Sequence, residues 1–114
     1  MAVIKENIIE EFYDFIKYLL PIIEKFPRSQ KFILGDRISN KVMDIHEMYI
    51  EAYYSARSNK KEILQKINIK LEQLRYLIRL CFEWHYINNK RYEYISGLLL
   101  QLGKKTGAWI NSLK

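Results

Sequence analysis

The stretch LGDRISNKVMDIHEMYIEAYYSA, residues 34–56, decides the fold. Its apolar residues recur at steps of three and four, which places them on one face of an α-helix. They are Leu34, Ile38, Val42, Ile45, Tyr49, Ala52 and Ala56. A stripe of this length is typical of a helix that packs lengthwise against other helices.

The segments on either side show the same spacing. The core positions expected there are Ile8, Phe12, Phe15 or Ile16, Leu19 and Ile23 before it, then Leu64, Ile67, Leu71, Leu74, Ile78 and Cys81, and finally Ile95, Leu98 or Leu99, Leu102, Thr106, Trp109 and Leu113. The pattern predicts helices over approximately 7–23, 27–57, 60–87 and 90–113. Alternation at period two is absent over any useful length, so strands are not expected.

Polar residues and prolines suggest where these helices begin and end. Asn7 is a candidate N-cap, and Pro21 should bend or end the first helix because proline lacks a backbone N–H. Pro27 is well placed to open the second helix. Asn59 is expected to stop one helix and cap the next, and Asn88-Asn89 repeats the break.

Length and composition agree with one packed domain, residues 1–114. The chain has 114 residues, is 49% hydrophobic and 28% charged, and contains only 4 Gly and 2 Pro. Three of those glycines, Gly97, Gly103 and Gly107, lie in the last helix and permit either close helix approach or fraying. Two short breaks between long helices favour an all-α, antiparallel up-down-up-down four-helix bundle.

The chain carries no sign of export or membrane insertion. Cys81 is the single cysteine, so neither an internal disulfide nor a thiol cluster is expected. The longest apolar run, residues 18–23, is far shorter than a membrane span, and acidic residues interrupt the N-terminal segment. These features predict a cytoplasmic protein without a membrane partner.

The basic charge is concentrated in the second half. The formal net charge is +6, but residues 1–57 contain 8 basic and 9 acidic residues, whereas residues 58–114 contain 11 and 4. Candidate nucleic-acid-binding residues are Arg75, Arg79, Lys61, Lys66, Lys70, Lys90, Arg91, Lys104 and Lys105. Lysine and arginine bind phosphates without regard to sequence. The alternative is a solvated basic face that keeps the protein soluble.

Arg75 and Arg79 are the sharpest candidates. They are one helical turn apart, so their guanidinium groups can bind adjacent phosphates. Phe82 and Tyr86 continue the same stripe as candidate stacking groups. Aromatic residues at helical spacing also serve as core or subunit contacts, and that alternative stays open.

A second apolar face on the third predicted helix points to self-association. Leu77, Leu80 and Trp84, flanked by Tyr76 and Ile87, lie about a third of a turn from the core stripe. An exposed patch of this kind indicates a partner surface, here an oligomer interface. The alternative is a wide core face with Trp84 covering the end of the bundle.

No pattern supports catalysis. His46-Glu47 begins like a zinc-protease helix, but Ile50 occupies the position of the second histidine ligand. The glycine-rich phosphate loop, the nucleophile elbow and the Glu-x-x-His pairs of di-iron bundles are all missing. We therefore expect neither an enzyme nor a metal or other cofactor.

The segment KFPRSQKFILGDRI, residues 25–38, resembles the junction of the first two helices in the accessory variability determinant (Avd) proteins of diversity-generating retroelements. Those proteins have a Phe-Pro-basic segment that leads into a Leu-Gly-polar-Arg-Ile helix start. Helix lengths, tight second and third turns, and a basic second hairpin with a Trp near the C-terminus extend the similarity loosely over the whole chain.

The resemblance implies a basic four-helix bundle that assembles as a homopentamer. It also implies association with the element's reverse transcriptase and with structured RNA, with DNA as a further candidate ligand, in support of mutagenic cDNA synthesis. Arg75 and Arg79 would then contact nucleic acid or the polymerase, and the second apolar face would fit a subunit interface. The alternatives are a four-helix protein of the kind encoded in 23S ribosomal RNA intervening sequences and a purely structural oligomeric scaffold.

Overall fold

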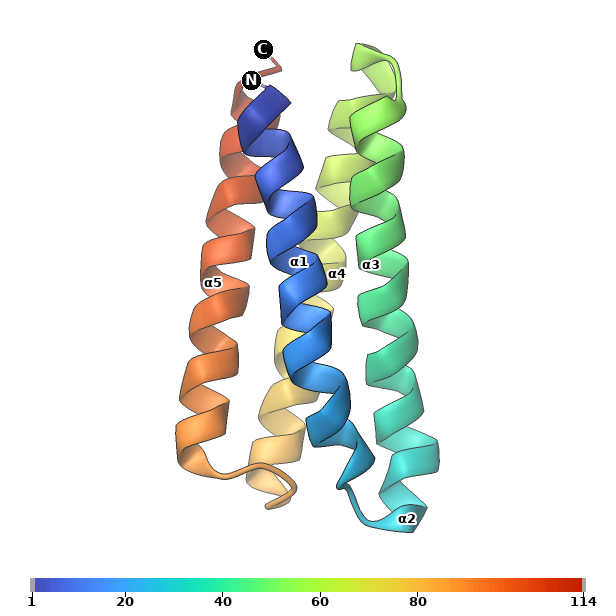
Figure 1. Ribbon diagram of the computed structural model, residues 1–114, viewed down its shortest axis with the longest axis vertical. Helices are drawn as coiled ribbons and strands as arrows, with labels where there is room; N and C mark the ends of the chain where they lie inside the picture. Colours follow the sequence, from blue (N-terminus) through green and yellow to red (C-terminus); the bar gives the residue numbers. More distant parts are fainter. Residues whose placement is uncertain (1, 114) are drawn as a thin grey trace.

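The computed structural model describes residues 2–113, and it describes side chains from residue 7 to residue 113. Its elements are α1 (Ala2–Glu24), α2 (Arg28–Gln30), the π-helical turn η1 (Lys31–Gly35), α3 (Asp36–Tyr54), α4 (Arg57–Glu83) and α5 (Asn89–Asn111). Within these residues there are no strands, and α2, η1 and α3 follow one another without a break, so four long helical segments form an elongated bundle of 44 × 23 × 20 Å. Both chain ends lie at one end of the bundle, and α2 lies at the other (Figure 1).

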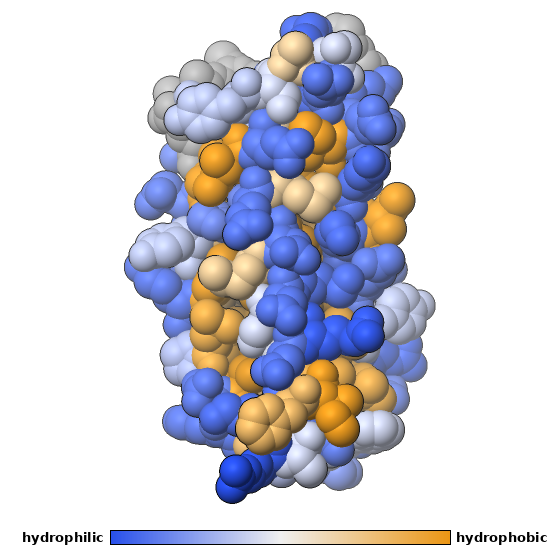
Figure 2. Space-filling model, turned by 90° about the vertical axis from the view of Figure 1, so that its right-hand side faces the viewer, coloured by the Kyte–Doolittle hydropathy of each residue, from blue (hydrophilic) through white to orange (hydrophobic). Residues whose placement is uncertain are grey.

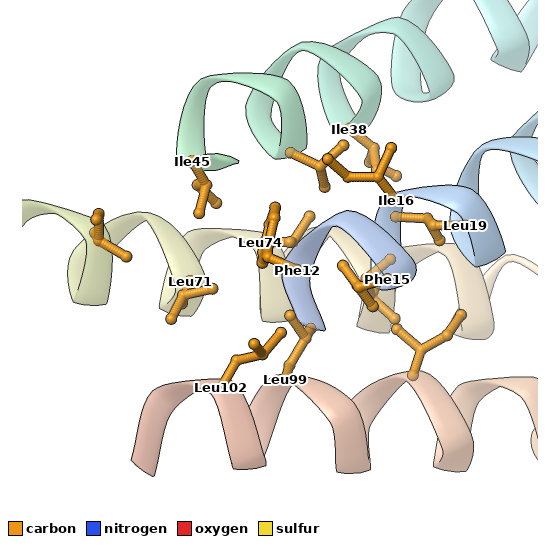
Figure 3. Close-up of a cluster of buried hydrophobic side chains, with 14 of the residues drawn as sticks. Phe12, Phe15, Ile16, Leu19, Ile38, Ile45, Leu71, Leu74, Leu99 and Leu102 are labelled. Carbon is orange, nitrogen blue, oxygen red and sulfur yellow. The ribbon is translucent and has the colours of Figure 1, made fainter. Parts of the chain in front are cut away.

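The core runs the length of the bundle, and each long helix contributes to it. Figure 3 shows Phe12 and Leu19 of α1 in the same cluster as Ile38 of α3, Leu74 of α4 and Leu99 of α5. Each such side chain contributes about 1.5 to 3 kcal/mol when fully buried. The apolar stripes predicted from the spacing are confirmed except at two positions: Ala56 is exposed, and Leu113 is half-buried. Of the alternatives Leu98 and Leu99, Leu99 is the buried one.

The first helix is longer than expected. It begins at Ala2, so Asn7 lies inside it and is not its N-cap. Pro21 also lies inside it, and the helix continues to Glu24. Pro21 is exposed, whereas Ile22 and Ile23 directly after it are buried in the core. Burial of these two side chains offsets the backbone hydrogen bond that proline removes.

Pro27 opens the second long helical segment, as predicted. Its carbonyl accepts hydrogen bonds from the backbone N–H groups of Gln30 and Lys31, both at 2.9 Å. The π-helical turn that follows was not predicted. Gly35 ends this turn at a close approach to α1, where a Cβ atom would lie 2.9 Å from Cγ2 of Ile23.

The break between α3 and α4 lies earlier than predicted. α3 ends at Tyr54 and α4 begins at Arg57, so Asn59 neither stops a helix nor caps one; it lies in the first turn of α4. Lys60 is the residue that secures this corner. Its Nζ donates to the last carbonyls of α3, at 2.9 Å from Ala52 O and 2.7 Å from Tyr53 O. A cation at this position is favoured by the helix dipole.

The break at Asn88-Asn89 is confirmed, and Asn88 is the N-cap of α5. Its side chain accepts a hydrogen bond from Arg91 N at 2.8 Å. α4 nevertheless ends at Glu83 and not at Ile87. His85 adopts the left-handed conformation with φ 65, and Tyr86 N donates to Cys81 O at 2.8 Å, which closes a Schellman motif.

The three glycines of α5 do not mark a close helix contact within the described residues. A Cβ atom added at Gly97, Gly103 or Gly107 would meet nothing within 4 Å. Among the described residues, no helix combines the length and apolar character needed to cross a membrane.

Candidate nucleic-acid interface

Arg75 and Arg79 lie on the exposed side of α4, and each already has a carboxylate partner one turn away. Arg75 binds Glu72 through two hydrogen bonds, Nε to Oε1 at 2.9 Å and Nη2 to Oε2 at 3.0 Å. Arg79 Nε donates to Oε2 of Glu83 at 3.0 Å. In each case the hydrogen bond, assisted by the negative charge, raises the pKa of the guanidinium group.

These ion pairs leave the arginines available to a ligand. The side chains of Arg75 and Arg79 are 51% and 58% exposed. Exposed ion pairs are weak because water screens them, and an arginine has five N–H donors. A phosphate can therefore bind the free N–H groups, although Glu72 and Glu83 reduce the local positive potential.

Both arginines line grooves along the contact between α4 and α5. One groove is lined by Arg75, Tyr76 and Arg79 of α4 and by Tyr92, Glu93 and Ser96 of α5. A neighbouring groove includes Arg75 again, together with Lys104 of α5. The two grooves share Arg75, so Arg75, Arg79 and Lys104 lie along the same side of the bundle. We call the two grooves together the α4–α5 groove.

Phe82 and Tyr86 are engaged inside the molecule. The ring of Phe82 stacks on Tyr92 with centroids 4.4 Å apart and planes 8° apart. Tyr86 lies 5.6 Å from the ring of the buried Phe26. Both side chains are half-buried and pack against the core, so they support the α4–α5 end of the bundle.

The other predicted cations are distributed over different sides of the bundle. Lys66 pairs with Glu62 of its own helix at 3.7 Å, and Lys105 pairs with Glu11 of α1. Lys90 and Arg91 line a groove beside Tyr18 of α1. Within the described part of the chain, no ion pair is made by Lys61, Lys70, Lys90, Arg91 or Lys104.

Two cations of α3, Arg37 and Lys41, were not predicted from the sequence. Burial lowers the pKa of Lys41, and the nearby charges of Lys70 and Arg37 lower it further, against a smaller opposing effect of Asp44. Lys41 Nζ donates to Oε1 of Gln73 on α4 at 2.9 Å. The i, i+4 spacing of Arg37 and Lys41 indicates that both lie on one face of the helix. This pair was overlooked because residues 1–57 contain slightly more acidic than basic residues.

The predicted oligomer-interface residues differ in exposure. Leu77 and Leu80 are half-buried and pack against the core, and Ile87 is buried. Trp84 and Tyr76 remain 54% and 60% exposed. The core of the single chain therefore covers part of this face, and the subunit interface remains a prediction.

Neither histidine belongs to a cluster of potential metal ligands among the described residues. In the described residues, no three His, Cys, Asp or Glu side chains lie close enough together to hold an ion. The ring of His46 stacks 6.1 Å from Phe12 and lies 6.0 Å from Tyr13. His85 is exposed and occupies the turn after α4.

The family to which the chain belongs follows from comparison with known proteins. Comparison with curated proteins and with solved structures gave no significant match. A family model described as bAvd-like matches residues 3–113, which is nearly the whole chain and covers all the helices just described apart from the first residue of α1. The chain therefore belongs to the bAvd-like family of Avd-type accessory proteins.

Proposed function

We propose that this protein is a non-catalytic accessory subunit that binds structured RNA and the reverse transcriptase of a diversity-generating retroelement, and so supports mutagenic cDNA synthesis in the cytoplasm. The α4–α5 groove carries the proposal, because it aligns Arg75, Arg79 and Lys104 on the surface of a bAvd-like chain. DNA offers the same backbone phosphates and is a second ligand of this groove.

The scaffold of the proposed site is an antiparallel, up-down-up-down bundle. The positions of the chain ends and of α2 in Figure 1 support this arrangement. The corners secured by Lys60 and Asn88 support it as well, because each reverses the chain within a few residues.

We also propose that the subunit assembles as a homopentamer. The exposed Trp84 and Tyr76 support a contact between copies beside the α4–α5 groove. Light scattering of the purified protein should give about five times the subunit mass of 13.8 kDa. A single-subunit mass at micromolar concentration would remove the pentamer from the proposal.

RNA binding is tested through salt dependence and charge. Affinity for the element's structured RNA should fall steeply as salt rises, and Arg75→Gln with Arg79→Gln should weaken it and make the logarithmic salt slope smaller by about 1.5. The control Lys17→Gln with Lys25→Gln removes the same charge from α1 and the residues after it, and should change the slope less. Absence of RNA binding at low salt would favour the purely structural scaffold.

Substitution of the carboxylate partners of Arg75 and Arg79 should change RNA affinity in the opposite direction. Glu72→Gln with Glu83→Gln replaces the charged partners of both guanidinium groups with neutral amides and removes two negative charges beside the groove. RNA affinity should therefore rise. The same two pairs of variants, tested for capture of the reverse transcriptase, show whether the groove binds the polymerase or the RNA.

A further inference from the structure

The π-helical turn exposes two large apolar side chains. Phe32 and Ile33 are 64% and 68% exposed, and they are consecutive in η1. The next two residues, Leu34 and Gly35, are buried, and Gly35 packs closely against Ile23 of α1. The turn is therefore anchored by Leu34 and Gly35, and this leaves Phe32 and Ile33 on the surface. π-Helical turns of this kind are frequent at functional sites.

Ile33, which directly follows Phe32, lies beside cations of α3. Ile33 lines a groove together with Arg37, Asn40, Lys41 and Asp44, and Lys41 is close to Lys70 of α4. In Figure 2, which faces α3, apolar surface gathers at the end of the molecule where α2 lies, below a hydrophilic band. We call Phe32, Ile33, Arg37, Lys41 and Lys70 the α3–α4 surface.

The cations of this surface lack the carboxylate partners that Arg75 and Arg79 have. Among the described residues, Arg37, Lys41 and Lys70 form no ion pair, and Lys41 is hydrogen-bonded to the neutral amide of Gln73. Their mutual repulsion lowers the pKa of Lys41 beyond the effect of burial, and Asp44 offsets only part of it. A bound anion would relieve this repulsion.

An aromatic ring beside clustered cations suits one chemical unit in particular. A nucleotide of a single strand presents a flat base next to a phosphate, and proteins bind such strands with aromatic platforms and basic grooves. In a duplex the base faces are stacked on one another, so Phe32 would have nothing to stack on. The amides of Asn40 and Gln73 add hydrogen-bonding groups that are not limited to one base.

We propose that the α3–α4 surface binds single-stranded nucleic acid, with Arg37, Lys41 and Lys70 on the backbone phosphates and Phe32 stacked on an unpaired base. The proposal rests on the proposed function in that the protein binds nucleic acid. It adds a second contact, built from the first hairpin as well as the second, that selects unpaired strands.

The test compares a fluorescent 12-nucleotide oligo(U) with a 12-base-pair RNA duplex in titrations at fixed salt. Phe32→Ala should weaken binding of the single strand by about 5- to 100-fold and change binding of the duplex by less than about twofold. Phe32→Trp should preserve the single-strand affinity. Lys41→Gln with Lys70→Gln should weaken single-strand binding and reduce its salt slope.

Tyr54→Ala is the matched control. Tyr54 is 80% exposed and lies on the same helical segment, 22 residues from Phe32, which is about 33 Å along a helix. This variant should leave both affinities unchanged. Because Phe32 and Tyr54 are both exposed, thermal unfolding curves of the two variants should match that of the parent protein.

Two outcomes would overturn the proposal while leaving the proposed function in place. One is binding of the single-stranded oligonucleotide that depends on Arg75 and Arg79 but is unaffected by Phe32→Ala. The other is loss of reverse transcriptase capture by Lys41→Gln with Lys70→Gln at unchanged affinity for both oligonucleotides, which would make this surface a protein contact.

Discussion

The phenolic oxygen of Tyr49 on α3 lies 2.7 Å from Oγ1 of Thr106 on α5, and both residues are completely buried. Oγ1 of Thr106 also lies 2.7 Å from the carbonyl oxygen of Leu102. Since a carbonyl only accepts, Thr106 donates to Leu102 and accepts from Tyr49. Burial raises the pKa of Tyr49, with a smaller opposing effect of this hydrogen bond, so Tyr49 remains a neutral donor.

The direction of this hydrogen-bond chain predicts unequal effects of its two ends. Tyr49→Phe leaves Thr106 bonded to Leu102 and should lower the free energy of unfolding by about 1 kcal/mol. Thr106→Val leaves the buried Tyr49 hydroxyl without an acceptor and should cost about 2 to 3 kcal/mol. The double variant should be more stable than Thr106→Val alone. Urea unfolding measures all three, and equal costs of the single variants would contradict the assigned donor.

Gly35 and Gly97 should respond to alanine with opposite signs. At Gly35 the added methyl group would lie 2.9 Å from Ile23 Cγ2, and this overpacking should cost about 1 to 3 kcal/mol. At Gly97 the methyl group meets nothing, so the better helix propensity of alanine should add about 1 kcal/mol. Thermal unfolding of the two variants measures both effects. Ile23→Leu removes Cγ2 and should recover part of the loss in Gly35→Ala.

His85→Gly should stabilise the chain. His85 has φ 65, a conformation that costs a residue with a side chain about 1 kcal/mol and costs glycine very little. We expect a higher melting temperature for His85→Gly and a lower one for His85→Val, whose branched side chain tolerates this conformation worst. A melting temperature of His85→Gly below that of the parent would show that the histidine side chain stabilises the turn.

Cys81 should resist thiol reagents until the chain unfolds. The side chain is fully buried, and burial raises the pKa of the thiol from 9.0 to about 12. At pH 8 the native thiol is therefore both inaccessible and protonated. Modification by a chromogenic disulfide should be slow in buffer and fast in denaturing urea. Fast modification in buffer would mean that α4 opens locally.

The same shift predicts alkaline destabilisation. The unfolded chain loses the Cys81 proton near pH 9, whereas the native chain keeps it to about pH 12, so the stabilisation is complete below pH 9 and is lost between these values. Between pH 8 and pH 10 the Cys81→Ala variant should lose about 1.4 kcal/mol less stability than the parent. Equal losses would assign the alkaline transition to another group, such as Tyr49.

The apolar spacing predicted most of the core. Ile38, Val42, Ile45, Tyr49 and Ala52 were all expected on one face, and all are buried. The errors lie at helix ends. Burial of Ile22 and Ile23 carries α1 past Pro21, and the left-handed turn at His85 ends α4 early. In both places a tertiary contact or a single backbone angle outweighs local propensity.

The candidate interface was harder to predict than the core. The spacing of charged residues along the sequence does not indicate which residues of other helices lie next to them. The pairing of Arg75 and Arg79 with Glu72 and Glu83 follows from i, i+3 and i, i+4 spacing within one helix. The proximity of Lys41 and Lys70 does not, since the two residues belong to different helices. The net charge of each half of the sequence does not reveal such a cluster, because its members come from both halves.

By itself the sequence determined the four helical stripes, the breaks at Pro27 and Asn88, and the resemblance that the family match confirmed. These features depend on neighbours within one or two helical turns. Only the tertiary structure decided that Thr106 accepts from Tyr49, that Phe32 is held outside the core, and which cations share a surface. Those relationships join residues on different helices, and the packing of the bundle sets their distances.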